Sequence, residues 1–406
     1  MNTHFKVGIL RETKNPPDRR VALPPAQAKD LMESFKNVEV VVQPSNIRCF
    51  KDEEYGNLGI KLQEDISDCD VLIGVKETKI PTIIASKTYL IFAHVAKKQP
   101  HNQPLIQAFT GNRNTLIDYE YLTDKNKNRL IAFGHWAGVV GAYNAIRALH
   151  LKTAMRELQP ANQMHDYNEL KILLEELQLP AQKFIVTGGG RVAGGATEIL
   201  QRAKVKEISP DDFLTKEYSY PVYCRLDPWH YAQRKNNEPF EWNSWVSNPA
   251  DYESSFLPYT KVADVMIACH YWDFRSPHFF TLEDMAKPEF KISIIADVSC
   301  DIPGPIPSTI RASTIADPFF DFNPNTGEEE PAFSNAKNVT VMSIDNLPGE
   351  LPRDASEFFG KLLVEKILPQ FFCDDCEAII ERATIIKNGV LTPRYAYLQN
   401  YLEGNE

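Results

Sequence analysis

Two side chains that can transfer protons follow buried strands in the N-terminal part of this 406-residue chain. Lys76 follows the apolar run "VLIGV", and His94 follows "YLIFA". In a parallel sheet the carboxyl ends of the strands face the ligand crevice, so both side chains are predicted to point into a binding site. Histidine titrates near neutrality, and lysine can act as a base if burial or nearby cations lower its pKa. On position alone, the lysine could also be a solvated end cap and the histidine a core residue.

Other charged side chains nearby could bind carboxylate or ammonium groups. Arg20 lies in "RETKNPPDRRVALPP" after the first strand, and Arg129 precedes "LIAFG". A guanidinium group can bind a carboxylate through two parallel hydrogen bonds, which a lysine cannot do. Lys97 follows His94 closely and could add a further cation, although it could also be an exposed charge. Glu120, near a strand end, could receive an ammonium group.

A glycine turn in "FIVTGGGRVAGGA" indicates a dinucleotide site. It follows an apolar strand at 183–188, and a helix is predicted to begin near its arginine. In such turns the first glycine permits the bend, the second lets the backbone approach a pyrophosphate, and the helix N-terminus faces the phosphates. An ordinary βα turn is the alternative. The predicted cofactor contacts of this turn are Gly188, Gly190, Arg191, Val192 and Ala193.

The next predicted strand, 204–209, bears on the choice of cofactor. An acid at the end of the second strand of such a fold binds the ribose 2′-hydroxyl of NAD, but here Ser209 stands at that place. A serine could donate to the 2′-phosphate of NADP, and Arg225 further along could supply positive charge. Asp211 could instead fold back as the ribose acid. The pattern favours NADP, with NAD left open.

Alternating apolar runs and helical patterns predict an α/β protein with parallel sheets. The polar, aromatic stretch 215–258 is predicted to be an insertion after the second strand, and insertions of this length usually cover a site or an interface. The predicted strands are 5–10, 38–43, 69–75, 88–94, 183–188, 204–209, 261–272, 291–300, 308–314 and 338–345; the predicted helices include 25–35, 103–112 and 134–158.

Composition excludes several classes of protein. A formal net charge of −10 argues against nucleic-acid binding, which needs a basic surface. No stretch approaches the roughly 20 apolar residues of a membrane helix, and no secretory signal is visible. Seven scattered cysteines are typical of reduced thiols in a cytoplasmic protein. Cys373 and Cys376 form a CxxC without a second pair, so no metal site is expected.

Longer motifs carry a family resemblance. The segments "SIDNLPGELPRDASEFFG", "VVQPSNIRCF", "IAFGHWAGVVGA", "PYTKVADVMIACHYW" and "ADVSCDIPGPI" resemble the family of alanine dehydrogenase and lysine-forming saccharopine dehydrogenase. The similarity is greatest to the lysine–2-oxoglutarate reductase half of bifunctional α-aminoadipic semialdehyde synthase. It implies two Rossmann-like domains with the active site in the cleft between them. The first would combine residues 1–140 with 346–406, and the second would span 141–345.

The resemblance also implies a reaction, in which lysine condenses with 2-oxoglutarate and a nicotinamide cofactor reduces the imine to saccharopine. It makes Lys76 and His94 the acid–base pair and Arg20 a ligand of a substrate carboxylate. Lys97 with Gln99 resembles the saccharopine-type enzymes. Asp301, Asp345 and Asn346 would lie near the nicotinamide ribose and amide, although Asp and Asn also favour turns.

Two alternatives to this reaction stay open. One is an amino-acid dehydrogenase that uses ammonia and a small 2-oxo acid, as alanine dehydrogenase does. The other is a regulatory protein that binds NADP(H) and has lost catalysis. Self-association is not determined by the sequence. The chain departs from the family at Ser209 and Ala193. In the fungal enzyme a disulfide joins the glycine loop to the third strand; here Cys269 is present, but Val192 stands in the place of the other cysteine, so this disulfide cannot form.

Overall fold

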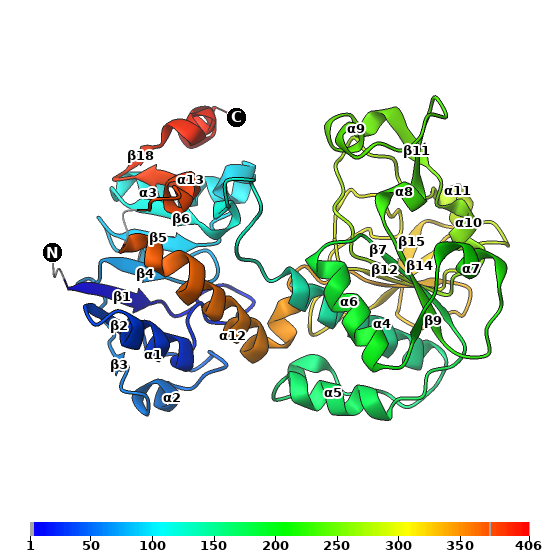
Figure 1. The fold of residues 1–406 in the computed structure, drawn as a ribbon, viewed down its shortest axis with the longest axis horizontal. Helices are drawn as coiled ribbons and strands as arrows, with labels where there is room; N and C mark the ends of the chain where they lie inside the picture. Colours follow the sequence, from blue (N-terminus) through cyan, green and yellow to red (C-terminus); the bar gives the residue numbers. More distant parts are fainter. Residues whose placement is uncertain (1–3, 373–374, 406) are drawn as a thin grey trace. The chain divides into compact units, whose positions relative to one another are not determined.

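The computed structural model describes residues 4–372 and 375–405. The chain forms two compact units (Figure 1). Unit 1 comprises Met1–Phe133 and Pro352–Glu406, and unit 2 comprises Gly134–Leu351. Each unit contains one eight-stranded, mostly parallel sheet with helices, so the predicted class of two Rossmann-like α/β domains is confirmed.

The sheet of unit 1 has the order β18-β17-β6-β5-β4-β1-β2-β3. Strands β1 to β6 run parallel, whereas β17 from the C-terminal segment pairs antiparallel with β6, and β18 pairs antiparallel with β17. The central strands are apolar runs because a parallel sheet covered on both faces buries every side chain. The strands are β1 (Phe5–Ile9), β2 (Val38–Val42), β3 (Lys61–Leu62), β4 (Val71–Ile73), β5 (Thr88–Ile91), β6 (Thr115–Asp118), β17 (Thr384–Lys387) and β18 (Val390–Leu391).

The helices of unit 1 come from both parts of the chain. α12 is anchored to the N-terminal part, because the Ser356 hydroxyl accepts a hydrogen bond from the Val21 amide at 2.9 Å. The ring of Phe359 also stacks on Phe133 with centroids 4.5 Å apart. The helices are α1 (Pro25–Ser34), α2 (Asp52–Gly56), α3 (Gln103–Gly111), α12 (Pro352–Leu362), α13 (Ile379–Ala383) and α14 (Gln399–Glu403).

The sheet of unit 2 has the order β15-β14-β16-β13-β12-β7-β9-β8. Its strands are β7 (Lys183–Thr187), β8 (Lys206–Glu207), β9 (Val222–Leu226), β12 (Val265–Ala268), β13 (Ile294–Asp297), β14 (Phe320–Asn323), β15 (Glu328–Glu330) and β16 (Val339–Met342). The predicted strand 308–314 is wrong, since it contributes only an isolated bridge between Ser313 and Ile344.

The strand beside β7 is not the one expected from the sequence. The predicted second strand, 204–209, is reduced to β8, which lies at the edge of the sheet. β9, inside the stretch predicted to be an insertion, pairs with β7 from Lys183–Val222 to Thr187–Leu226. The insertion therefore begins only after Leu226, and β9 carries the residues that flank the glycine turn.

Close packing of α4 (Gly134–Lys152) against α6 (Arg191–Arg202) holds the helix that follows the glycine turn. A Cβ at Gly138 would lie 1.8 Å from the Val192 carbonyl oxygen, and one at Gly195 would lie 2.0 Å from that of His135. Only glycine fits at these two crossing points. The remaining helices of unit 2 are α5 (Tyr167–Glu176), α7 (Pro210–Thr215), α8 (Pro228–Tyr231), α9 (Trp242–Ser247), α10 (Leu257–Thr260) and α11 (Leu282–Met285).

Within the described ranges, no helix has both the length and the apolar character needed to cross a membrane. Across the same residues, no three His, Cys, Asp or Glu side chains gather in a way that could hold a metal ion. Cys373, one half of the CxxC, lies outside the described residues.

Candidate active site

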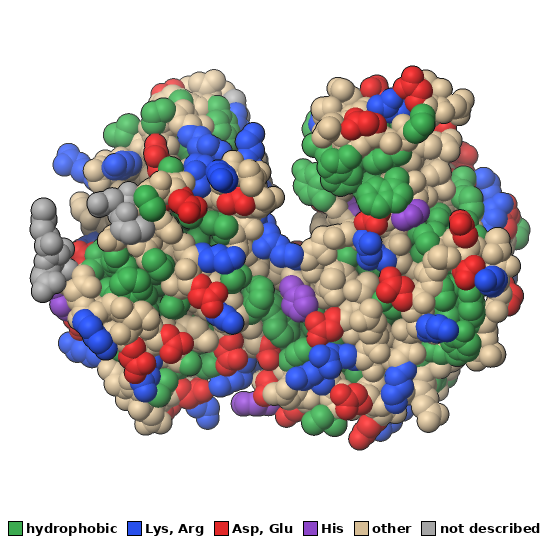
Figure 2. Space-filling model, viewed as in Figure 1, with side chains coloured by type: hydrophobic (Ala, Val, Ile, Leu, Met, Phe, Trp, Pro, Cys, Tyr) green, Lys and Arg blue, Asp and Glu red, His purple; other side chains and the backbone are tan. Residues whose placement is uncertain are grey.

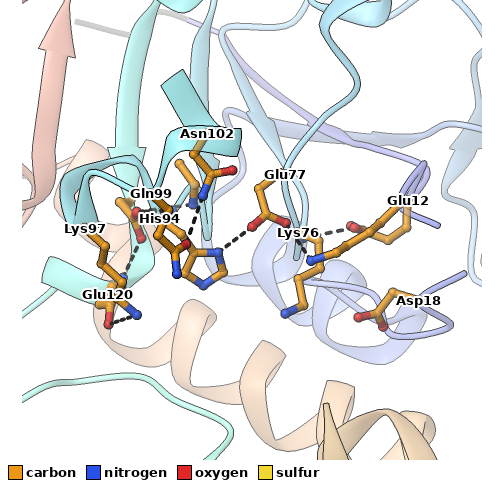
Figure 3. A network of polar contacts seen from close by, with 12 residues as sticks. Glu12, Asp18, Lys76, Glu77, His94, Lys97, Gln99, Asn102 and Glu120 are labelled. Carbon is orange, nitrogen blue, oxygen red and sulfur yellow. Dashed lines mark hydrogen bonds and ion pairs between the residues drawn. The ribbon is translucent and has the colours of Figure 1, made fainter. Parts of the chain in front are cut away.

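A buried carboxylate joins the loops that follow β1 and β4. The Glu12 side chain, on the first loop, accepts the amides of Val75 at 2.6 Å and Lys76 at 2.9 Å (Figure 3). Burial raises the pKa of Glu12 to about 7. This contact fixes the backbone of Lys76 at the carboxyl end of the sheet, where the sequence predicted it.

The electrostatic surroundings of Lys76 suit a base. Burial lowers the pKa of its ammonium group to about 8, and the positive charges of Arg20 and Lys14 act in the same direction. The ordinary value is about 10.4, so a neutral amine forms far more readily here than on an exposed lysine. A lysine that loses its proton near neutral pH can accept one from a substrate.

Arg20 is held in place by Asp18. The guanidinium donates from Nε to Oδ1 at 3.0 Å and from Nη2 to Oδ2 at 2.6 Å, and it lies over the ring of Phe133 at 4.4 Å. The two side chains are 3% and 1% exposed, so removing either would leave an uncompensated buried charge. Arg20 therefore sits close enough to affect Lys76, and its direct contact with a substrate carboxylate stays a prediction.

His94 is oriented by two carboxylates. Its Nδ1 lies 2.5 Å from Glu77 Oε1, and its backbone amide, in the left-handed region with φ of 54°, donates to the buried Asp118 at 3.0 Å. Burial acts to raise the pKa of Glu77, but the hydrogen bond and charge of His94 outweigh it and lower the pKa to about 2. Glu77 thus stays charged and holds one ring nitrogen, which leaves Nε2 for a substrate.

Two further cations meet at Glu120, beyond His94. Lys97 Nζ and Arg129 Nη2 each lie 3.0 Å from Glu120 Oε1, and Arg129 Nε donates to the Glu120 carbonyl at 3.2 Å. Lys97 belongs to the short 3-10 turn η2 (Val95–Lys97), which starts at the residue after His94. Unit 1 therefore holds Lys97, Glu120 and Arg129 in one cluster, and their role as substrate ligands stays a prediction.

The glycine turn of unit 2 has the geometry of a phosphate cradle. Gly188 has a φ of 92°, and a Cβ there would meet the Cys269 carbonyl oxygen at 2.9 Å. Gly190 is the N-cap of α6, and a Cβ on it would meet no protein atom within 4 Å. The amides of the helix N-terminus therefore border open space, as a pyrophosphate site requires. The residues of the turn fit a dinucleotide.

This turn opens into a cavity of about 790 Å³. Asp227, the residue after β9, lines it and forms an ion pair with Arg225, whose Nη1 lies 2.7 Å from Asp227 Oδ1. Because β9 is the neighbour of β7, Asp227 occupies the place where this fold carries its ribose acid.

The expectation that Ser209 ends the strand beside the glycine turn is therefore wrong. Ser209 is the N-cap of α7, where its hydroxyl accepts the Asp212 amide at 3.1 Å, and neither Ser209 nor Asp211 lines the cavity. Sequence reasoning missed Asp227 because β9 lies in a polar, aromatic stretch. The apolar run "VYCRL" directly before this aspartate was the available signal.

Asp301, Asp345 and Asn346 follow β13 and β16, as predicted, at the carboxyl ends of their strands. None of the three lines the cavity at the glycine turn. Burial, aided by the charge of Asp297, raises the pKa of Asp301 to about 6. Their proposed place near the nicotinamide stays a prediction.

We expect Gly190→Ala to weaken dinucleotide binding without unfolding the protein. The new methyl group would meet no protein atom, so it would occupy only the space that a pyrophosphate needs. Gly194→Ala, inside α6 and equally unobstructed, is the matched control and should stabilise the helix by about 0.5–1 kcal/mol. Calorimetric titration with dinucleotide and thermal unfolding measure the two effects. Equal affinity in both variants would contradict a phosphate site at this turn.

Comparison with known proteins first defines the class. Residues 8–140 match the family "Alanine dehydrogenase/PNT, N-terminal domain". The fold is that of a solved L-alanine dehydrogenase, with a TM-score of 0.67 and 16% identity over 99% of this chain and 100% of that one. A transhydrogenase from Sinorhizobium meliloti also superposes, with a TM-score of 0.59 and 16% identity over 95% and 98% of the two chains. The class agrees with the predicted oxidoreductase that uses a nicotinamide cofactor.

Curated relatives narrow this class. The chain is 30% identical to α-aminoadipic semialdehyde synthase of Arabidopsis thaliana, over 98% of this chain and 42% of that protein. It is 27% identical to saccharopine dehydrogenase [NAD(+), L-lysine-forming] of Emericella nidulans, over 89% of this chain and 91% of that one. The chain thus spans less than half the length of the synthases that it matches. The family resemblance stated from the sequence is confirmed.

Proposed function

We propose that this protein condenses L-lysine with 2-oxoglutarate and reduces the product to saccharopine with a nicotinamide cofactor. The observation that carries the proposal is the charge arrangement of unit 1, where Lys97 and Arg129 lie at Glu120 beyond the proton-transfer residues. Two cations at one glutamate leave a net positive charge, which suits the second carboxylate that 2-oxoglutarate has and pyruvate lacks. The scattered free thiols of Cys49, Cys69, Cys224, Cys269 and Cys300 favour a cytoplasmic location.

Each side chain has a distinct task in this proposal. Lys76, whose pKa is lowered to about 8, accepts the proton of the substrate ammonium and frees its amine to attack the oxo carbon. His94, held through Nδ1 by Glu77, donates a proton from Nε2 to the departing hydroxyl group so that water leaves. Reduced nicotinamide, when bound, supplies the hydride that completes the reduction.

The cofactor side of the proposal rests on Asp227. A carboxylate at the end of the strand next to the glycine strand accepts the ribose hydroxyls of NAD and repels the 2′-phosphate of NADP. Arg225 is paired with that carboxylate at 2.7 Å and does not itself line the cavity. We therefore propose NAD(H) as the preferred cofactor, in place of the NADP favoured by the sequence pattern around Ser209.

A co-substrate screen tests the function. Purified protein is incubated with NADH or NADPH and either lysine plus 2-oxoglutarate or ammonium plus pyruvate, and cofactor oxidation is followed by absorbance. We expect oxidation with lysine and 2-oxoglutarate, and saccharopine as the product by mass spectrometry. Turnover only with ammonium and pyruvate would replace the proposal by an alanine dehydrogenase activity. Tight cofactor binding without turnover of either pair would indicate a regulatory protein.

A further inference from the structure

Part of the lining of the unit 2 cavity is aromatic. Trp229, Trp242 and Val246 line it and are 51%, 53% and 59% exposed. Hydrophobic side chains gather on the face of unit 2 where Figure 1 places α8 and α9 (Figure 2). Large apolar side chains grouped at the mouth of a cavity mark a binding surface rather than a solvated one.

The other residues that line the cavity limit what can occupy its aromatic part. The glycine turn, the N-terminus of α6 and Asp227 line the same cavity. Trp229 follows Asp227 by two residues, and Tyr271 lies on the loop after β12, the strand on the other side of β7. A dinucleotide with its pyrophosphate at the turn and its ribose at Asp227 would extend its adenine towards the indoles.

The insertion presents these indoles from a rigid support. Glu241 caps α9 by accepting the amides of Asn243 at 2.8 Å and Ser244 at 2.6 Å, and the Tyr252 hydroxyl donates to the Glu241 carbonyl at 2.9 Å. Trp245 packs edge-on against Tyr252 at 5.1 Å. Trp242 and Val246 are four residues apart and therefore share a face of α9. Trp245 anchors the helix on Tyr252, whereas Trp242 and Val246 are exposed and can contact a ligand.

A buried polar group in the same wall also lacks a partner. His270 lines the cavity, and its Nδ1 lies 2.9 Å from the Thr187 hydroxyl. That hydroxyl also accepts the Cys269 amide at 3.2 Å. Nε2 is buried without a hydrogen-bond partner among the described residues. A buried polar nitrogen left unpaired is costly, and a ligand such as a purine base, which carries both donors and acceptors, would satisfy it.

We propose that Trp229, Trp242 and His270 form an adenine subsite, in which the insertion of unit 2 stacks indoles on the base and His270 offers it a hydrogen-bonding nitrogen. The inference rests on the proposed nicotinamide cofactor and names the residues that hold its adenosine half. Stacking uses the face of the base and does not need the nicotinamide half. The subsite should therefore bind free AMP in addition to the whole dinucleotide.

The test uses three probes on the full chain: AMP, nicotinamide mononucleotide and NAD⁺, each measured by calorimetry and by quenching of tryptophan fluorescence. We expect Trp242→Ala to weaken AMP and NAD⁺ binding by about ten-fold to a hundred-fold and to leave nicotinamide mononucleotide unchanged. Trp242→Phe should keep most of the affinity because it keeps a ring to stack. Tyr220→Ala, an exposed aromatic of unit 2 that does not line the cavity, is the control and should change nothing.

Three results would overturn the subsite. These are unchanged AMP affinity in Trp242→Ala, an equal loss for all three probes, and a change only in self-association by sedimentation. The proposed function fails separately: wild-type protein that binds AMP and NAD⁺ but turns over neither substrate pair keeps the subsite and loses the function. Wild-type turnover together with unchanged AMP and NAD⁺ binding in Trp242→Ala would keep the proposed function and overturn the subsite.

Discussion

Replacing Lys76 by methionine is expected to lower kcat for saccharopine formation by a factor of roughly 10²–10⁴, the usual contribution of one positioned acid or base. The sign of the pH dependence follows from the pKa of about 8. Below that pH the amine is protonated and cannot accept a proton, so wild-type kcat should rise with pH and level off above about 8. In Lys76→Met this limb of the profile should disappear.

The control for this prediction is Lys79→Met, which removes an exposed lysine from the same loop. It should leave both kcat and the pH profile unchanged. A Lys76→Met enzyme that keeps the wild-type rate, or that loses rate but keeps the limb near pH 8, would show that another group is the base. Thermal unfolding of both variants distinguishes lost chemistry from lost structure.

Asp227→Ser should reverse the cofactor preference. The variant loses the carboxylate that binds the ribose hydroxyls of NADH, which is worth roughly 1.5–3 kcal/mol for a hydrogen bond to a charged group, or about ten-fold to 150-fold in affinity. It also releases the guanidinium of Arg225 from its 2.7 Å ion pair, so that a 2′-phosphate can bind it. We therefore expect weaker NADH binding and tighter NADPH binding, measured as dissociation constants by fluorescence titration.

A double variant makes the cofactor prediction specific. Asp227→Ser with Arg225→Ala should lose the gained NADPH affinity, since no cation then replaces the carboxylate. Ser209→Ala and Asp211→Ala, at the N-terminus of α7, should leave both cofactors unaffected. A selective loss of NADPH in Ser209→Ala would instead restore the hypothesis drawn from the sequence.

Most of the fold could be predicted because parallel strands buried on both faces are apolar runs, as in β1, β2 and β7. The glycine turn was equally readable, since few other structures need glycine at those spacings. β9 could not be recognised from the sequence, because it lies between polar and aromatic residues that resemble a loop. Chain order also misled: the strand that follows α6 lies at the edge, and the later β9 takes the inner place. Strand order within a sheet depends on long-range pairing that local patterns do not record.

The candidate site also contains some residues whose place could be predicted from the sequence and some whose place could not. Lys76 and His94 follow recognisable strands, so their place was predictable from local sequence. The roles of Glu12 and Asp118 were not predictable, because each side chain accepts hydrogen bonds from backbone amides of other segments. The two amides that Glu12 accepts, from Val75 and Lys76, lie 63 and 64 residues away in the sequence. In the sequence, a carboxylate that is buried by contacts with distant segments looks the same as an exposed acid.

The split composition of unit 1 has a consequence for biosynthesis. Unit 2 is one continuous stretch, so it can fold as soon as residue 351 has left the ribosome. Unit 1 must wait for β17 to pair with β6 and for α12 to reach Val21, which is more than 300 positions earlier. During synthesis the half-finished sheet therefore keeps an open edge at β6, and it is there that a nascent chain of this protein would most need a chaperone.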